Sequence, residues 1–325
     1  MLLNFAEWLR QVDPSAQGRA YLNAYRRFSL ALDVCTVQAF GTALRNLHHR
    51  MEERAQQVPN QARSRHPREV PVVPLVLGGD DLTVVCAGQY AVRFTHDFLT
   101  AFETETMKND TAHMDGIIPQ IAQQAFKAPR LSSCAGIAIV KPHFPFHAAY
   151  ELAEELLQSA KQVKQSVSGP CSALDYHVLY DASGADLKRI RDYLKVDNGV
   201  TVLVGRPYVV TPREYLGEAQ HNPWVAPRLW DHLHNRVQAM CQTDTEDTQR
   251  RLLPNSMLHT LREGLFLDHQ QADARMRLVR QRYQAHGFET LMGSTESLFW
   301  PEMHDAQAGY TTGFLDALDL VGFWQ

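Results

Sequence analysis

The strongest constraint on the fold is a pair of short apolar runs joined by Gly-Gly-Asp-Asp within Leu75–Gly88. The runs are rich in β-branched residues, and a glycine turn between such runs is typical of a β-hairpin. Gly78 and Gly79 have no Cβ atom, so the backbone there can adopt positive φ and a phosphate can come close. We therefore predict a buried hairpin with a four-residue turn that ends at Asp81.

Asp80 and Asp81 place two adjacent carboxylates at the head of the second apolar run. Burying such charges is costly unless a cation lies beside them, and oxygen ligands of this kind suit Mg²⁺ or Mn²⁺ bridging to substrate phosphates. Gly and Asp are also favoured in turns for conformational reasons alone. The pattern therefore leaves two interpretations open, a metal site and an ordinary hairpin turn.

The spacing of apolar residues around the hairpin predicts an α/β half followed by a helical half. Helices are expected at 2–12, Arg19–Glu53, Arg93–Met107, His147–Gln165 and Leu187–Tyr193, and further strands at Leu131–Lys141, Leu174–Tyr180 and Val200–Val204. Beyond Thr211 the pattern is helical, at Arg228–Met240, Gln249–Leu267, Asp273–His286 and Thr312–Leu320. We predict one domain over 1–210 and an α-helical C-terminal domain over 211–325.

Two segments outside the hairpin have features that suit contact with a ligand. Small residues at Ser133, Ala135 and Gly136 would let another backbone or a ligand approach the third strand. The segment 54–70 is polar and basic, and it reads either as a solvated loop or as a phosphate contact. Its clustered basic residues are Arg63, Arg65, His66 and Arg68.

Composition limits the class of protein. The chain has 325 residues, 45% of them hydrophobic and 21% charged, which is ordinary for a globular protein with a large core. The net charge of −4 argues against broad nonspecific nucleic-acid binding. Five cysteines without a Cys-x-x-Cys pair indicate free thiols in a reducing compartment. With no signal peptide and no membrane-length apolar run, we expect a cytoplasmic protein without membrane contact.

The order helix, strand, Gly-Gly-Asp-Asp, strand, helix, strand, Ala/Lys-rich helix resembles the palm of diguanylate cyclases and of type III CRISPR effector subunits. The chain resembles more closely the second palm domain of the large polymerase-like subunit of those CRISPR complexes. Diguanylate cyclases carry Glu-Phe where this chain has Asp81-Leu82. The CRISPR resemblance covers roughly 1–210 and is carried by Tyr25–Asp33, Ser133–Ile139, Leu152–Lys161, Ser172–His177 and Gly205–Tyr208.

The resemblance implies an α+β fold with a ferredoxin-like βαββαβ palm. Active members are nucleotidyltransferases that condense ATP into cyclic oligoadenylate by two-metal phosphoryl transfer with Mg²⁺ or Mn²⁺. The catalytic and metal-binding residues it implies are Asp80 and Asp81, and the substrate-binding positions are Gly78, Gly79, Ser133 and Lys161. Lys161 matches the lysine that contacts the triphosphate in palm cyclases, and an exposed helix lysine is the alternative interpretation.

The sequence departs from the family pattern at its N-terminus. Palm enzymes have a first, central strand that ends in a further aspartate, whereas 1–8 reads as the helix after it. An HD nuclease segment and zinc-binding cysteines are also absent from the sequence. In a sheet of order 4-1-3-2 the missing strand leaves both flanking strands unpaired. Either the recorded start is downstream of the true one, or a partner chain inserts a strand, or the flanking strands close on each other. We expect one of the first two.

Two functions are compatible with these residues. The first is a CRISPR-type palm cyclase in antiviral defence, catalytic in its complete assembly, with ATP as substrate and effector subunits and RNA as partners. The second is a catalytically silent palm that acts as a scaffold subunit of a ribonucleoprotein effector complex. The intact Gly-Gly-Asp-Asp favours the first, and the absence of the first-strand aspartate favours the second.

Overall fold

The computed structural model describes residues 7, 9, 18–57, 71–180, 186–243, 251–282, 297–304 and 307–324. The basic residues Arg63, Arg65, His66 and Arg68 lie outside the described residues, as does most of the helix predicted at 2–12. The fold is α+β, as predicted, with helices around three small sheets.

The elements follow one another in the predicted order over most of the described chain. The helices are α2 (Arg19–Gln57), α3 (Gly88–Thr106), α4 (Ile117–Phe126), α5 (Phe146–Lys161), α6 (Leu187–Asp192), α7 (Arg213–Leu216), α8 (Trp230–Cys241), α9 (Asn255–Leu265), α10 (His269–Arg282) and α12 (Phe314–Leu320). The strands are β1 (Val72–Gly78), β2 (Asp81–Cys86), β3 (Cys134–Ile139), β4 (Ala173–Val178), β5 (Lys195–Val196), β6 (Thr201–Val202), β7 (Tyr208–Val209), β8 (Trp300–His304) and β9 (Gln307–Thr311).

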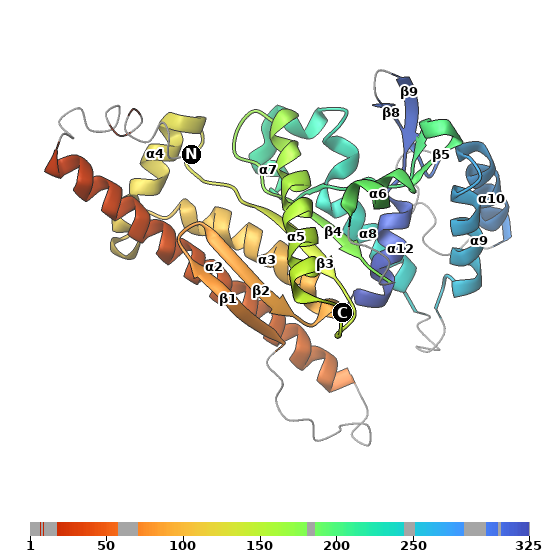
Figure 1. Ribbon diagram of the computed structural model, residues 1–325, viewed down its shortest axis with the longest axis horizontal. Coiled ribbons are helices and arrows are strands. Elements are labelled where there is room, and N and C mark those ends of the chain that lie inside the picture. The colour runs from red at the N-terminus through yellow and green to blue at the C-terminus, as the bar shows by residue number, and fades with distance from the viewer. Residues whose placement is uncertain are drawn as a thin grey trace.

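Helices α2 and α3 pack against each other and support the hairpin β1–β2 (Figure 1). On α3 the buried residues Phe94, Phe98 and Phe102 recur four apart, which puts them on one face of the helix. Phe40 of α2 meets Phe94 edge to face, with ring centroids 5.8 Å apart. The hairpin packs against this aromatic layer.

The hairpin predicted from the Gly-Gly-Asp-Asp stretch is confirmed, with two differences. Gly78 pairs with Asp81, so the turn has two residues rather than four. The hairpin is also less buried than expected, because its outer face is open to solvent. The apolar side chains about half exposed there are Val73 (49%), Leu75 (50%), Val76 (49%) and Val85 (46%).

Strands β3 and β4 run parallel, as the crossover through α5 requires, and β7 pairs antiparallel with β4. A further sheet has the order β5-β6-β9-β8. The helical pattern predicted beyond Thr211 missed β8 and β9, and the segment 108–130 contains α4 where no element was predicted. Strand β9 pairs with its neighbour β8 over five residue pairs and with β6 over two, and the pairing with β6 is a contact distant in sequence that local propensity does not report.

The four-stranded palm sheet implied by the resemblance is not formed by the described strands. Strand β2 pairs with β1, and β3 pairs with β4, in separate sheets. Both sheets nevertheless pack alternate residues against one core: Leu82 and Val84 of β2 are partly buried against it, and Ile137 and Ile139 of β3 are buried in it. The two sheets therefore lie in one layer with a gap between them, and the strands that flank the gap have not closed on each other.

The main core continues across the boundary predicted at residue 211. It contains Phe94 and Tyr176 from one side of that boundary and Trp230, Leu258 and Phe314 from the other. Division into domains at 211 stays a prediction, because packing in the described chain is continuous there. Among the described helices, none combines the length and the apolar character needed to cross a lipid bilayer.

Candidate functional site

The Gly-Gly-Asp-Asp turn is held by two side chains of α2. The backbone N–H of Gly79 donates to Oδ1 of Asp33 at 3.1 Å, and the hydroxyl of Thr36 donates to the Gly79 carbonyl at 2.5 Å. Gly79 has φ +58°, in the left-handed region that favours glycine. A Cβ at Gly78 would lie 3.2 Å from Asp33 Oδ1, so the lack of a side chain at Gly78 allows the close approach of the turn to α2.

Asp80 and Asp81 are both exposed at this turn. The expectation that their carboxylates are buried is wrong, because they lie at the turn, where the end of the hairpin reaches solvent. Within the described part of the chain, no ion pair or side-chain hydrogen bond engages either carboxylate. Their oxygens are therefore open to a ligand. Because the two carboxylates are exposed, the cost of burying charge is not an argument for a cation beside them.

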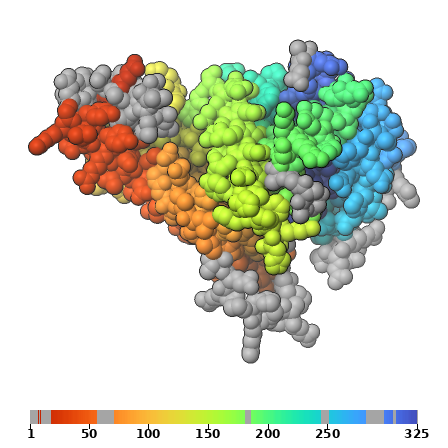
Figure 2. Space-filling view, in the orientation of Figure 1, coloured from red at the N-terminus to blue at the C-terminus, as the bar shows by residue number. Residues whose placement is uncertain are grey.

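A cavity of about 490 Å³ opens beside the turn, between β2 and β3. Figures 1 and 2 show the hairpin and α5 on the same face of the molecule, next to each other. Four elements supply most of the cavity lining. The lining residues are Asp81, Leu82, Thr83 and Val84 of β2, Phe94, Thr95, Phe98 and Phe102 of α3, Cys134, Ala135 and Gly136 of β3, and Tyr150, Ala153, Glu154 and Leu157 of α5, together with Thr36 of α2, Val76 of β1, Asp80 and Ser133.

Helix α5 brings a third carboxylate to this cavity. The charge of Glu154, and the hydrogen bond that the Tyr150 hydroxyl donates to it, raise the pKa of that hydroxyl, and the charge of Asp81 adds to the rise. The charges of Glu154 and Asp81 therefore both act on the Tyr150 hydroxyl. The charged residues that line the cavity, Asp80, Asp81 and Glu154, are all acidic.

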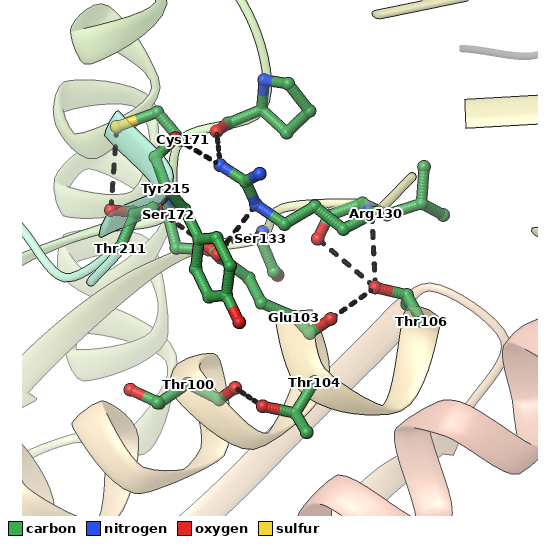
Figure 3. A network of polar contacts seen from close by, with 12 residues as sticks. Thr100, Glu103, Thr104, Thr106, Arg130, Ser133, Cys171, Ser172, Thr211 and Tyr215 are labelled. Carbon is green, nitrogen blue, oxygen red and sulfur yellow. Dashed lines mark hydrogen bonds and ion pairs between the residues drawn. The ribbon is translucent and has the colours of Figure 1, made fainter. Parts of the chain in front are cut away.

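Ser133 lines the cavity, and its position is fixed by a buried polar network (Figure 3). Its backbone N–H donates to Oγ of Ser172 at 3.1 Å, and the Ser172 N–H donates to Oγ1 of Thr211 at 2.7 Å. The Thr211 hydroxyl donates to Glu103 of α3, which is 1% exposed and pairs with Arg130 at 3.1 Å. The network ties the start of β3, one wall of the cavity, to α3.

Lys161 is the last residue of α5 and is exposed. It is not among the residues that line the cavity, which end on α5 at Leu157, one turn earlier. Its charge, with that of Lys164, lowers the pKa of the Cys134 thiol against the larger opposing effect of burial. The structure thus brings Ser133 to the turn carboxylates but does not place Lys161 among the cavity residues.

The Gly205–Tyr208 motif has a structural role. Arg206 forms a buried ion pair with Asp316 at 2.9 Å, and Tyr208 and the Gly205 N–H donate to the same carboxylate at 2.9 Å and 2.7 Å. The Tyr176 hydroxyl donates to the Asp316 carbonyl at 2.7 Å. The motif therefore holds α12 against the strands.

The residues present at the turn suit a hard divalent cation. Mg²⁺ is usually held by one or two carboxylates together with water and substrate phosphates, so two adjacent acids at an open turn fit that requirement. Asp80 and Asp81 are the residues that would hold it. In the described part of the chain, His, Cys, Asp and Glu side chains do not gather in threes or more to form a closed cation site.

Comparison with known families bears on this arrangement. Residues 34–167 match the model of the family described as Cas10/Cmr2, second palm domain. Over these residues the chain is similar to a second palm domain of the Cas10/Cmr2 family. The match confirms the resemblance to a type III CRISPR Cas10-like subunit, over a shorter stretch than the predicted 1–210. A search of curated proteins found no match to the chain.

Sequence reasoning missed several residues that support the site. Asp33 and Thr36 hold the turn, and Tyr150 and Glu154 line the cavity. Asp33 and Glu154 lie in stretches that carried the resemblance, Tyr25–Asp33 and Leu152–Lys161. The sequence signal available for Thr36 was that it is a polar residue on the buried side of α2.

Proposed function

We propose that this palm domain is a nucleotidyltransferase that makes cyclic oligoadenylate from ATP in CRISPR-type antiviral defence. The observation that carries the proposal is the pair of exposed carboxylates, Asp80 and Asp81, at a turn anchored beside a cavity. Their placement leaves room for both a cation and a triphosphate.

The residues of the turn and its two anchors on α2 would have different roles. Asp80 and Asp81 would hold Mg²⁺ or Mn²⁺ through carboxylate oxygens, and the cation when bound supplies charge stabilisation for phosphoryl transfer. Gly78 and Gly79 let the phosphates approach the backbone, while Asp33 and Thr36 keep the turn in position. Preorganised positioning of this kind supplies much of the rate of phosphoryl transfer.

Other substrate contacts are proposed on the same grounds. Ser133 would offer its hydroxyl at the cavity margin. Lys161 is exposed near the end of α5, and it would reach only the distal phosphates of a triphosphate that extends along that helix. Other type III effector subunits are the expected protein partners of a Cas10/Cmr2 palm, and RNA is a proposed partner within that assembly.

The test is incubation of the assembled protein with labelled ATP and Mn²⁺, followed by detection of pyrophosphate and a cyclic product. The double variant Asp80→Asn/Asp81→Asn should lose at least about a hundredfold in rate, since charge stabilisation by a bound group is worth several kcal/mol. The matched control is Glu52→Gln/Glu53→Gln, an adjacent acid pair near the far end of α2, which should retain full activity. Equal rates for the wild type and the Asp80/Asp81 variant would refute the proposal.

A silent scaffold is the second candidate. It is favoured by the split between the β1–β2 and β3–β4 sheets, which leaves the described palm without its central strand. Under this function, the Asp80→Asn/Asp81→Asn variant assembles with effector subunits as the wild type does, and neither yields a cyclic product.

A further inference from the structure

A second cavity, of about 590 Å³, lies beyond the carboxyl end of β4. Its lining comes from that strand end and from α6, α9 and α12, and it shares no residue with the cavity proposed for ATP. Figure 1 shows these helices on the opposite side of β4 from the hairpin β1–β2. The volume is in the range of cavities that hold small ligands, and the carboxyl ends of parallel strands are a common place for them.

Exposed aromatic side chains line this cavity. They are Tyr180 (58% exposed), Tyr193 (68%) and Phe266 (41%), and buried apolar residues such as Leu179 lie beside them in the lining. Arg189 holds the Tyr193 ring, because its guanidinium carbon lies 5.8 Å from the ring centroid and its Nη2 donates to the hydroxyl at 3.3 Å. Aromatic faces exposed beside an apolar wall favour a flat ring as the ligand.

Two charged side chains of the cavity are free to bind a ligand. Within the described part of the chain, no ion pair or hydrogen bond engages the carboxylate of Asp319 on α12 or the guanidinium of Arg262 on α9. Burial and the charge of Asp319 raise the pKa of the Tyr180 hydroxyl, and the charge of Arg262 lowers it, so both charges act at one ring. A partly buried carboxylate without a donor is unfavourable, and a ligand that donates to it removes that cost.

These features match the parts of one chemical class of ligand. The aromatic rings suit a heteroaromatic base, and the Arg262 guanidinium suits a phosphate. Burial raises the pKa of Asp319 to about 6, so this carboxyl is ionised at neutral pH. An ionised carboxylate only accepts hydrogen bonds, and its two oxygens match the two adjacent N–H donors on the Watson–Crick edge of guanine. The same edge of adenine presents one donor beside an acceptor, which matches a carboxylate poorly.

We propose that this cavity binds a guanine nucleotide, with the base stacked on the aromatic rings, its Watson–Crick edge on Asp319 and its phosphate on Arg262. The nucleotide comes either free or as an unpaired residue of a single-stranded RNA, since both sources present the same base and phosphate. The inference goes beyond the proposed ATP chemistry and does not depend on it, because the two cavities have different residues.

The test is isothermal titration calorimetry of the full chain with guanosine monophosphate, adenosine monophosphate and guanosine. The buffer contains EDTA at about pH 7.5, which keeps Asp319 ionised and leaves no divalent cation for the Gly-Gly-Asp-Asp turn. Guanosine monophosphate should bind at least about tenfold more tightly than adenosine monophosphate, because two hydrogen bonds to a charged acceptor are gained. It should also bind at least about tenfold more tightly than guanosine, because the ion pair with Arg262 is gained.

Protein variants locate the binding. Asp319→Asn replaces one acceptor oxygen by a donor, so it should weaken guanosine monophosphate at least about tenfold and remove the preference over adenosine monophosphate. Arg262→Gln should weaken guanosine monophosphate to the level of guanosine. The matched control is Arg277→Gln, an exposed residue of α10 outside the cavity, which should leave all affinities unchanged. Circular dichroism checks that each variant folds.

Single-stranded RNA probes distinguish the two sources of the nucleotide. The pentanucleotide UUGUU, compared with UUAUU, binds more tightly than guanosine monophosphate if the ligand is an RNA, and more weakly if it is the free nucleotide.

Four results would overturn the inference. They are no binding of either guanine probe, equal affinities for the guanine and adenine nucleotides, unchanged affinity in Asp319→Asn, and displacement of guanosine monophosphate by spermidine, which would make the ligand an amine. None of these results alters the expected outcome of the ATP assay, so the two proposals fail separately.

Discussion

Asp33 of α2 accepts a hydrogen bond from the backbone N–H of Gly79 at 3.1 Å, across 46 residues of sequence. This contact fixes the turn that carries Asp80 and Asp81. We expect Asp33→Ala to destabilise the protein by about 1 kcal/mol, since the hydrogen bond is exposed. The same variant should lower ATP turnover more than tenfold through loss of positioning. Asp33→Asn keeps an acceptor oxygen and should retain most of the stability and most of the ATP turnover. Thermal unfolding and the ATP assay test this, and equal turnover for Asp33→Ala and wild type contradicts it.

Gly79 has φ +58°, and nothing lies within 4 Å of the position of a Cβ there. The cost of a side chain is therefore backbone strain rather than a clash. Gly79→Val should reduce the free energy of unfolding by about 1–2 kcal/mol. Gly79→Asn should cost less, because Asn tolerates the left-handed region. Chemical denaturation of both variants gives the comparison, and equal costs would mean that the turn changes conformation.

Arg206 and Asp316 form a buried pair, with their side chains 2% and 0% exposed. Asp316→Ala should destabilise the protein by about 3–5 kcal/mol, because the Arg206 guanidinium stays buried without its partner. The double variant Arg206→Met/Asp316→Ala should be more stable than Asp316→Ala. The matched control is Asp231→Ala, which breaks an exposed pair with Arg213 and should cost below about 1 kcal/mol. Similar costs for Asp316→Ala and Asp231→Ala would contradict the structural role of the pair.

Burial raises the pKa of Asp319 from 3.8 to about 6, while Arg206 and Arg262 oppose the rise and Asp316 adds to it. The folded state therefore binds more protons than the unfolded state between these values, so the free energy of unfolding falls as pH rises through that range. Asp319→Asn removes the penalty and should stabilise the protein by about 3 kcal/mol at pH 7 and far less at pH 4. Urea denaturation at the two pH values measures the difference. A gain that is equal at both would exclude titration of Asp319 as its cause.

The sequence predicted the parts of the palm that depend on local pattern. The Gly-Gly-Asp-Asp hairpin, the aromatic face of α3 and helix α5 follow from periodicity and turn chemistry. The exposure of Asp80 and Asp81 could not be predicted in this way, because it depends on how the turn of the hairpin lies against the rest of the fold. The anchors Asp33 and Thr36 and the strand pair β6–β9 also depend on contacts distant in sequence.

The roles of Asp80 and Asp81 are tested most directly by crystals soaked with ATP and Mn²⁺. The account predicts anomalous density for manganese within coordination distance of both carboxylates, about 2.0–2.2 Å as for other hard divalent cations, with the triphosphate against Gly78 and Gly79. Manganese and ATP bound elsewhere, with the two carboxylates contacting only protein side chains, would contradict it.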